Sequence, residues 1–180
     1  EYLVKTLGYR EGNIIFYENA TLATIKKAFV EMRNIYTEKK SDIFIYYSGH
    51  GAPDQESNQP YFVPIDADPN FIKDMGYAVN DLYELLNKLD SKSNTVVIDA
   101  CFSGRSENGM IIKDASPVVL KVENTFLLDE NSAVLTSATG TQLSSWYREM
   151  NHSLFTYYFL KALMGEADLN SNNQLTISEI

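Results

Sequence analysis

Two uninterrupted runs of β-branched and aromatic residues constrain the fold of this chain more than any other feature of its sequence. "DIFIYYS" occupies residues 42–48 and "TVVIDA" occupies residues 95–100. Neither run alternates apolar with polar residues, as a strand with one face in water would. Continuous runs are typical of parallel strands that are covered on both faces. We therefore expect a mainly parallel sheet that contains both segments.

Amphipathic stretches around these runs predict the helices that cover such a sheet. In residues 21–40, apolar residues recur at helical spacing behind Thr21, a residue type that caps the amino ends of helices. Because strands and helices alternate, the pattern predicts an α/β domain whose mainly parallel sheet has helices on both faces. The other predicted elements are helices over 80–92 and 153–165, a helix end closed by Gly8, strands over 13–20, 61–65 and 132–138, and a polar loop over 51–60.

Charge and cysteine content narrow the class of protein. Lysine and arginine number 15 against 24 aspartates and glutamates, and the net charge of −9 argues against nucleic acid or an anionic membrane as partner. The single cysteine excludes an intrachain disulfide. No apolar run approaches the roughly 18 residues of a membrane span, and no signal peptide is visible. We expect one cytoplasmic domain over residues 1–180 that is truncated at both ends.

Two of the predicted strands end on reactive side chains that are followed by a glycine on the loop side. The first ends on Ser-Gly-His-Gly at His50, and the second on Asp-Ala-Cys-Phe-Ser-Gly at Cys101. Parallel strands bring their carboxyl ends to one edge of a sheet, so the two side chains are expected to meet there. A thiolate is a good nucleophile, an imidazole can move its proton, and the amides of Gly51 and Cys101 could form an oxyanion hole. The alternative is a structural histidine and an inert buried cysteine.

With these motifs the sequence resembles the caspase-like cysteine peptidases (peptidase C14), in their metacaspase or bacterial caspase-homologue branch. The motifs are "YYSGHG" (46–51), "VVIDACFSG" (96–104) and "SSWYREMNHSLFTYYF" (144–159), in the family's order. The resemblance covers nearly the whole chain and implies a caspase-like sandwich. It also implies a cysteine endopeptidase that works through an acyl-enzyme, with Cys101 as nucleophile, His50 as general acid–base, and no cofactor required for the chemistry.

Departures from the caspase pattern concern the substrate pocket. Caspases cleave after Asp with a Gln two residues before the Cys and an Arg after a Ser-Trp pair, whereas this chain has Asp99 and Tyr147 there. Metacaspases carry an Asp at the first position, use a Ser two residues before the His, here Ser48, and cleave after Arg or Lys. We therefore expect a protein or peptide substrate with a basic residue before the scissile bond. Trp146 is expected to line the next subsite, and the alternative for Asp99 is a capping or sheet-edge carboxylate.

Two candidate calcium sites arise from the sequence. One is an EF-hand-like loop whose alternative is a polar turn, because its sixth position is Asn173 where such loops have Gly. The other follows from metacaspases, which bind activating calcium through aspartates; Asp66 and Asp81 resemble two of these, with Asn80 and Asn108 where aspartates would stand. The residues at positions 1, 3, 5, 7, 9 and 12 of the EF-hand-like loop are Asp168, Asn170, Asn172, Gln174, Thr176 and Glu179.

Family members are often cut after the cysteine motif into a large and a small subunit. By this resemblance residues 1–105 are large-subunit-like, 106–130 a linker and 131–180 small-subunit-like, with self-cleavage hypothesised at Arg105, Lys113 or Lys121. Dimerisation through an edge strand is a further expectation.

Three other functions compete with an active peptidase. They are an inactive caspase-like scaffold, a separase-like module of different specificity, and a small nucleotide-binding domain, the last of which lacks a Gly-rich phosphate loop. The second histidine, His152, is interpreted as structural.

Overall fold

The computed structural model describes residues 2–102, 105–106, 109–110, 131–137, 146–147, 152–176 and 178–180. The chain forms two compact units, the larger from Tyr17 to Leu143 and the smaller from Glu1–Phe16 together with Ser144–Ile180. No helix within the described ranges has the length and apolar character needed to cross a membrane.

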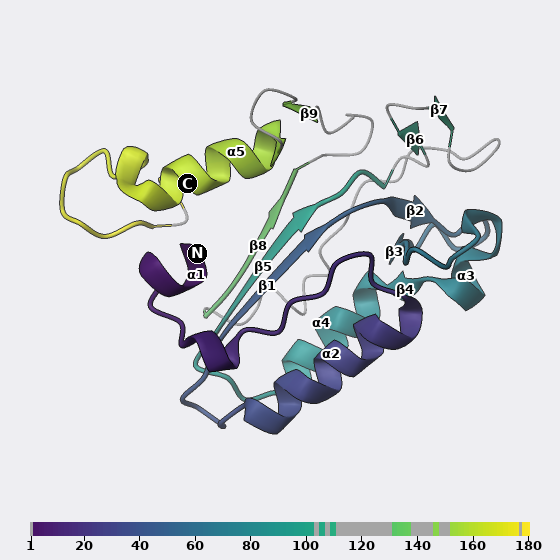
Figure 1. Cartoon of the computed structure of the whole chain (residues 1–180), viewed down its shortest axis with the longest axis horizontal. Helices are drawn as coiled ribbons and strands as arrows, with labels where there is room; N and C mark the ends of the chain where they lie inside the picture. The colour runs from purple at the N-terminus through teal and green to yellow at the C-terminus, as the bar shows by residue number, and fades with distance from the viewer. Residues whose placement is uncertain are drawn as a thin grey trace. The chain divides into compact units, whose positions relative to one another are not determined.

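A parallel three-stranded sheet lies at the centre of the larger unit (Figure 1). Its strands are β1 (Asp42–Ser48), β5 (Ser93–Asp99) and β8 (Ser132–Thr136), in the order β1-β5-β8. Both pairings are parallel, and the central strand β5 is buried along its carboxyl half. The continuous apolar runs therefore predicted the parallel sheet correctly, because a central parallel strand has no face in water.

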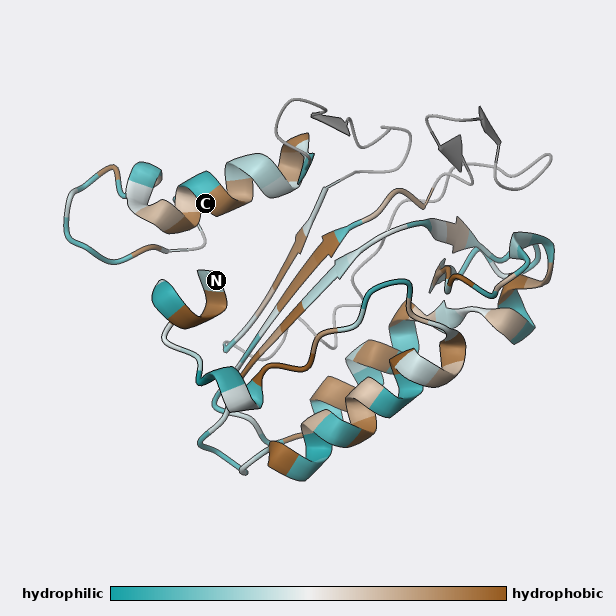
Figure 2. Ribbon diagram, in the orientation of Figure 1, coloured by the Kyte–Doolittle hydropathy of each residue, from teal (hydrophilic) through white to brown (hydrophobic). Residues whose placement is uncertain are grey.

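Two helices, α2 (Leu22–Ile35) and α4 (Val79–Lys88), cover one face of this sheet. Figure 2 shows apolar residues along both helices and along the strands. The core between them joins the helices to alternate residues of the strands, since successive strand residues point to opposite faces. Its fully buried members from α4 and the strands include Leu82, Leu86, Val96 and Ile98, with Ile25, Phe29, Ile45, Tyr47 and Val134 packed against the cluster.

Helix α2 confirms its predicted cap but is shorter than expected. The Thr21 side chain accepts a hydrogen bond from the Thr24 amide at 3.1 Å, as an N-cap does. The helix ends at Ile35, because Tyr36 is extended and the amide of Thr37 donates instead to the Ser41 hydroxyl in the turn before β1.

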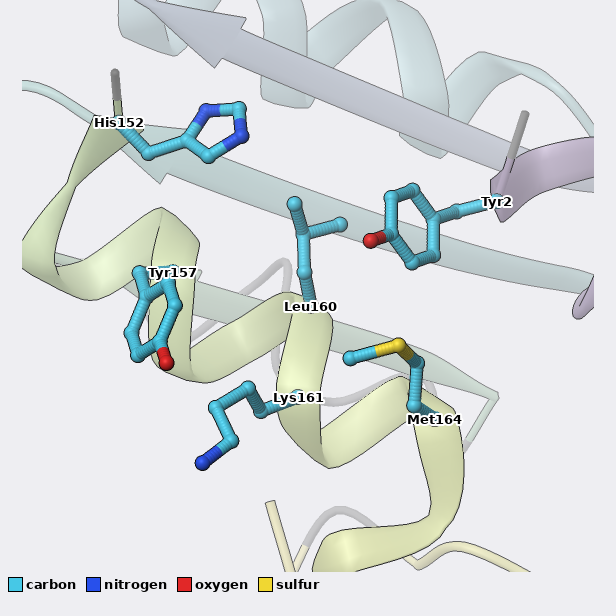
Figure 3. Close-up of a pocket in the computed structure, with 6 residues that line it drawn as sticks. All are labelled: Tyr2, His152, Tyr157, Leu160, Lys161 and Met164. Atoms are coloured by element: carbon cyan, nitrogen blue, oxygen red, sulfur yellow. The ribbon is translucent and has the colours of Figure 1, made fainter. Parts of the chain in front are cut away.

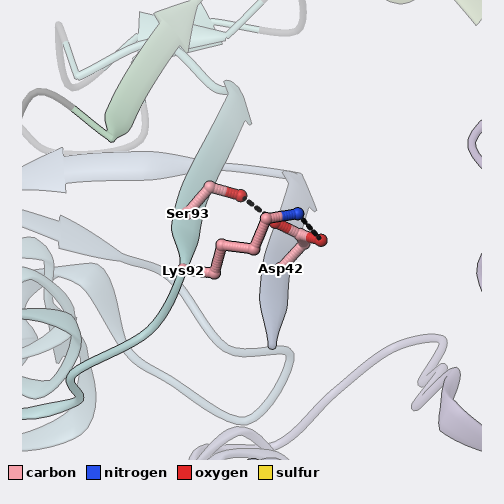
Figure 4. A network of polar contacts seen from close by, with 3 residues as sticks. All are labelled: Asp42, Lys92 and Ser93. Carbon is pink, nitrogen blue, oxygen red and sulfur yellow. Dashed lines mark hydrogen bonds and ion pairs between the residues drawn. The ribbon is translucent and has the colours of Figure 1, made fainter. Parts of the chain in front are cut away.

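A hydrogen-bonded cluster ties together the first residues of β1 and β5 (Figure 4). Ser93 Oγ donates to the Asp42 carboxylate at 2.6 Å, and Lys92 Nζ lies 3.2 Å from the same carboxylate. The hydrogen bond from Ser93 and the nearby lysine hold the pKa of Asp42 below its usual value. The cluster supports the register of the two strands at the end opposite to their carboxyl termini.

A second, antiparallel sheet follows β1 directly and corrects the predicted loop over 51–60. It contains β2 (Gly51–Pro53), β3 (Pro60–Phe62) and β4 (Tyr77–Ala78), in that order. Only the segment between Pro53 and Pro60 is a turn. Between β3 and β4 lie two short helices that the sequence pattern did not reveal, η2 (Pro69–Phe71) and α3 (Ile72–Met75).

The strand predicted over 13–20 is wrong. The structure has a short 3-10 helix, η1 (Glu11–Asn13), followed by irregular chain in which Phe16 is 73% exposed. A strand needs a backbone partner as well as β-forming side chains. None of the strands in the described part of the chain pairs with this segment.

Most of the described elements of the smaller unit are helices. It contains α1 (Tyr2–Lys5), the strands β9 (Trp146–Tyr147) and β10 (His152–Ser153), and α5 (Leu154–Lys161), which continues as a π-helical turn, η4 (Ala162–Glu166). Gly8 and Gly165 have φ of 73° and 105°, the left-handed region in which glycine commonly closes helices, so both predicted helix ends are confirmed. A short hairpin of β6 (Arg105–Ser106) and β7 (Gly109–Met110) belongs to the larger unit.

Candidate active site

The carboxyl ends of β1 and β5 lie side by side, as parallel strands require. The register pairs Ser48 with Asp99, the last residues of the two strands. Beyond this pair, the amide of Gly49 donates to the Asp99 carbonyl at 3.2 Å, which extends the pairing into the histidine motif. The segments that carry His50 and Cys101 therefore start from adjacent points at one edge of the sheet.

The two segments also contact each other beyond the strands. A Cβ atom at Gly51 would lie 2.6 Å from two ring carbons of Phe102 and 2.9 Å from the carbonyl oxygen of Cys101. Real Cβ atoms do not approach other atoms this closely, so only glycine fits at this position. The residue after His50 thus lies directly against the backbone carbonyl of Cys101 and the ring of Phe102.

The two reactive side chains differ in exposure. His50 is exposed, whereas Cys101 is half-buried. The backbone of His50 is fixed although its imidazole is open to solvent: its carbonyl accepts one hydrogen bond from the Val63 amide at 3.0 Å and another from the Tyr47 hydroxyl at 2.8 Å. An accessible imidazole and a partly shielded thiol on adjacent segments are the side chains that proton transfer and nucleophilic attack require.

Ser48 and Asp99 share the face of the sheet opposite to α2 and α4. Their neighbours Tyr47 and Ile98 belong to the core under those helices, so the following residue on each strand points the other way. Asp99 is 5% exposed, and a carboxylate this buried requires compensation by hydrogen bonds or positive charge. The pair predicted to form the substrate pocket therefore lies together, next to the candidate dyad.

The structure places two of the remaining predicted residues, Trp146 and Arg105, in short strands, which does not test their predicted roles. Trp146 lies in β9 of the smaller unit, so its contact with substrate stays a prediction. Arg105, one of the three hypothesised cleavage points, lies in β6 of the larger unit. Lys113 and Lys121 lie outside the described residues.

Side-chain oxygen atoms of the EF-hand-like loop accept hydrogen bonds from other groups of the same loop. The two Asp168 carboxylate oxygens accept from the amides of Asn172 at 3.1 Å and Asn173 at 2.8 Å. At the far end, Glu179 accepts from the Asn170 side-chain amide at 2.8 Å and from the Thr176 hydroxyl at 2.8 Å.

Backbone geometry at the sixth position of this loop matches an EF-hand. Asn173 has a φ of 59°, the conformation for which such loops use glycine. The side chains of Asn170 and Asn172 also accept from backbone amides within the loop. An all-oxygen donor set of this kind fits calcium better than a transition metal.

The second calcium candidate has a different local structure. Asp66 accepts a hydrogen bond from the Leu22 amide at 3.1 Å, so it serves the amino end of α2. Asn80 and Asp81 lie in the first turn of α4, and Asn108 lies outside the described residues. Among the residues that the structure describes, no cluster of three or more His, Cys, Asp or Glu side chains is arranged to hold a metal.

His152 lines a cavity of about 180 Å³ within the smaller unit (Figure 3). Figure 3 shows His152 at one end and Tyr2 at the other, with Leu160 of α5 between them. The remaining lining residues are Tyr157, Lys161 and Met164. His152 itself is exposed, and its structural role stays a prediction.

One residue of the site was not recognised in the sequence. Tyr47 reads there only as a strand former in "IFIYYS", yet its hydroxyl bonds to the backbone of His50. Its position three residues before the histidine is the only signal available, and that signal does not specify a contact.

Comparison with known proteins agrees with the geometry. The sequence matches the model of the caspase domain family, peptidase C14, over residues 1–178. A search of curated proteins returned no match. The matched range includes both strand ends and the parallel sheet that carries them. The chain therefore belongs to the caspase-domain family of cysteine peptidases, with the α/β fold of that family.

Proposed function

We propose that this chain is an active cysteine endopeptidase in which Cys101 and His50 form the catalytic dyad. The observation that carries the proposal is the contact of Gly51 with the backbone carbonyl of Cys101 and the ring of Phe102 at the shared end of β1 and β5. This contact between the histidine segment and the cysteine segment supports a shared site. An inactive scaffold has no need for a glycine-dependent contact between them.

The proposed reaction uses these residues in two steps. His50 takes the proton of the Cys101 thiol, and the thiolate sulfur forms a bond to the scissile carbonyl carbon. The amides of Gly51 and Cys101 stabilise the negative charge that develops on the carbonyl oxygen. When the carbon–nitrogen bond breaks, His50 gives its proton to the leaving amine, and a thioester remains. Water, deprotonated by His50, then hydrolyses the thioester and restores the thiol.

An active-site label tests the dyad. A peptidyl inhibitor with an Arg residue and a thiol-reactive group should attach to Cys101, and the His50→Ala variant should react much more slowly. A Cys101→Ala variant should show neither labelling nor peptide cleavage. Equal labelling of the parent and the His50→Ala variant would support the scaffold alternative, because the histidine would then have no role at the thiol.

The proposed specificity is cleavage after Arg or Lys. Ser48 and Asp99 lie on one face beside the dyad segments, and a carboxylate at this position attracts a cationic side chain and repels an acidic one. Paired fluorogenic peptides that differ only in Arg or Asp before the scissile bond should be cleaved in favour of Arg.

Replacing the pocket carboxylate tests this specificity further. Asp99→Asn should lower the rate on the Arg peptide roughly 10- to 100-fold, the worth of a charged hydrogen bond. Asp90→Asn, which alters an exposed carboxylate in the same unit, serves as the matched control. Faster release from the Asp peptide would refute the specificity, and a separase-like preference would appear as poor cleavage of both.

We also propose that the loop from Asp168 to Glu179 binds calcium. The side-chain oxygen atoms that accept hydrogen bonds within the loop and the left-handed Asn173 support this proposal. With only two carboxylates, a weak site with a Kd on the order of 10⁻⁴–10⁻³ M is expected. Titration calorimetry with CaCl₂ should detect binding that Asp168→Asn and Glu179→Gln remove and that Glu166→Gln, outside the loop, retains. The absence of heat in the parent chain would contradict the proposal.

A further inference from the structure

The hydroxyl of Tyr47 connects the end of β1 to the backbone of the candidate acid–base residue. Tyr47 Oη donates to the carbonyl oxygen of His50 at 2.8 Å. The Val63 carbonyl lies farther from the same hydroxyl, at 3.4 Å. A phenol has one proton to donate, and the shorter bond is the stronger, so His50 is the principal acceptor.

The backbone of Gly49 and His50 packs directly against this hydroxyl. The amide of Val63 donates to the same His50 carbonyl at 3.0 Å, so one donor from β1 and one from the chain after β3 hold a single oxygen. A Cβ at Gly49 would lie 2.8 Å from Tyr47 Oη. The glycine before His50 therefore allows the backbone to pass directly over the tyrosine.

Packing fixes the ring that presents the hydroxyl. The Tyr47 ring lies 4.2 Å from that of Phe62, centroid to centroid, and Phe62 lies 6.2 Å from Phe102. Phe102 follows Cys101 and is itself 4% exposed. The rings of Tyr47, Phe62 and Phe102 thus form a row from the residue that is hydrogen-bonded to His50 to the residue that follows Cys101.

The Tyr47 hydroxyl keeps its proton over the pH range in which a peptidase would work. Burial raises the pKa of Tyr47 well above its ordinary value of 10.0. The phenol accordingly stays protonated at neutral and moderately alkaline pH. The hydrogen bond from this hydroxyl to the His50 carbonyl therefore persists over that pH range.

We propose that Tyr47 is a positioning residue, whose hydroxyl orients His50 toward Cys101 through the His50 carbonyl. The inference rests on the proposed role of His50 in proton transfer. Without the hydroxyl, the carbonyl keeps only the Val63 amide, and the imidazole samples orientations that do not reach the thiol. The substrate pocket keeps its Gly49–Asp99 hydrogen bond, so binding changes little. A small misplacement of a catalytic group is enough to slow the reaction.

The test is Tyr47→Phe in the full chain, which removes one oxygen atom and leaves the ring. Tyr36→Phe is the matched control. Tyr36 packs against the same core, and its buried hydroxyl has no hydrogen-bond partner among the described residues. Tyr47→Phe should lower kcat for an Arg peptide three- to tenfold with KM nearly unchanged, as expected for the loss of one hydrogen bond. Tyr36→Phe should match the parent.

A second measurement does not depend on activity. The chain has two histidines, so its imidazole NMR spectrum has two sets of signals, assigned with a His152→Gln variant. In Tyr47→Phe the His50 signals should shift while those of His152, in the other unit, stay in place. Tyr36→Phe should move neither set.

Each outcome is decisive. Unchanged kcat together with unchanged His50 signals would overturn the inference. Movement of both histidines with a loss of helical circular dichroism would also overturn it, since it would show a general structural role. If the parent chain cleaves nothing, the proposed function fails, and the His50 signals alone decide whether Tyr47 positions the imidazole.

Discussion

Replacing Gly51 by alanine tests the contact between the histidine and cysteine segments directly. The added methyl carbon would lie 2.6 Å from the Phe102 ring and 2.9 Å from the Cys101 carbonyl oxygen. The ring cannot move away freely, because Phe102 is buried against Phe62. The backbone oxygen of Cys101 cannot move without displacing the nucleophile.

The expected magnitude follows from these distances. Overpacking of a well-packed site typically costs about 1–3 kcal/mol of unfolding free energy. Activity should fall further, since the displaced Gly51 amide is a proposed oxyanion-hole donor and the loss of one such donor lowers kcat roughly 100- to 1,000-fold. Gly12→Ala is the matched control, because a Cβ at Gly12 meets no atom within 4 Å.

Urea unfolding and cleavage of an Arg peptide measure the two effects separately. Gly51→Ala should show both the lower stability and the larger loss of rate, while Gly12→Ala should show neither. Equal behaviour of the two variants would refute the reasoning, because it would mean that the segments do not touch. A loss of stability with full activity would refute the oxyanion-hole assignment alone.

Three further predictions concern processing and stability. Self-cleavage after Arg105, Lys113 or Lys121 should disappear in Cys101→Ala, as followed by mass spectrometry; equal clipping of both chains would point to another protease. Leu82→Ala should cost about 2–5 kcal/mol in urea unfolding, because Leu82 is fully buried in the core under α4. Asp42→Asn should cost about 0.5 kcal/mol at neutral pH, since the carboxylate is partly exposed. Folding lowers the pKa of Asp42, so its stabilisation is present above the ordinary value of 3.8 and should vanish as the pH falls below it; a constant difference down to pH 2 would contradict this.

The fold was predictable where local pattern and tertiary environment agree. Strand β5 shows this, because a buried parallel strand leaves a continuous apolar run in the sequence. Strand β1 has a similar run but is only partly buried, with Tyr46 exposed. Helix α2 shows it too, since its capping Thr21 acts on an amide three residues away.

The pattern failed where pairing depends on a distant segment. β-forming side chains at 13–20 have no partner strand among the described residues, whereas Gly51–Pro53 forms a strand with little β propensity because it pairs with β3. Propensity describes one segment, but a strand exists only as part of a pair.

By itself the sequence determined at which end of the sheet His50 and Cys101 stand, and it predicted that these residues carry the chemistry. A histidine and a cysteine that each follow a parallel strand must lie at the same edge, whatever the details of packing. Only the tertiary structure decided how the two segments meet: the pairing of Ser48 with Asp99, the contact of Gly51 with Phe102, and the Tyr47 hydroxyl beneath His50. The physical reason is that these contacts depend on strand register and side-chain packing between segments about 50 residues apart, which no local pattern encodes.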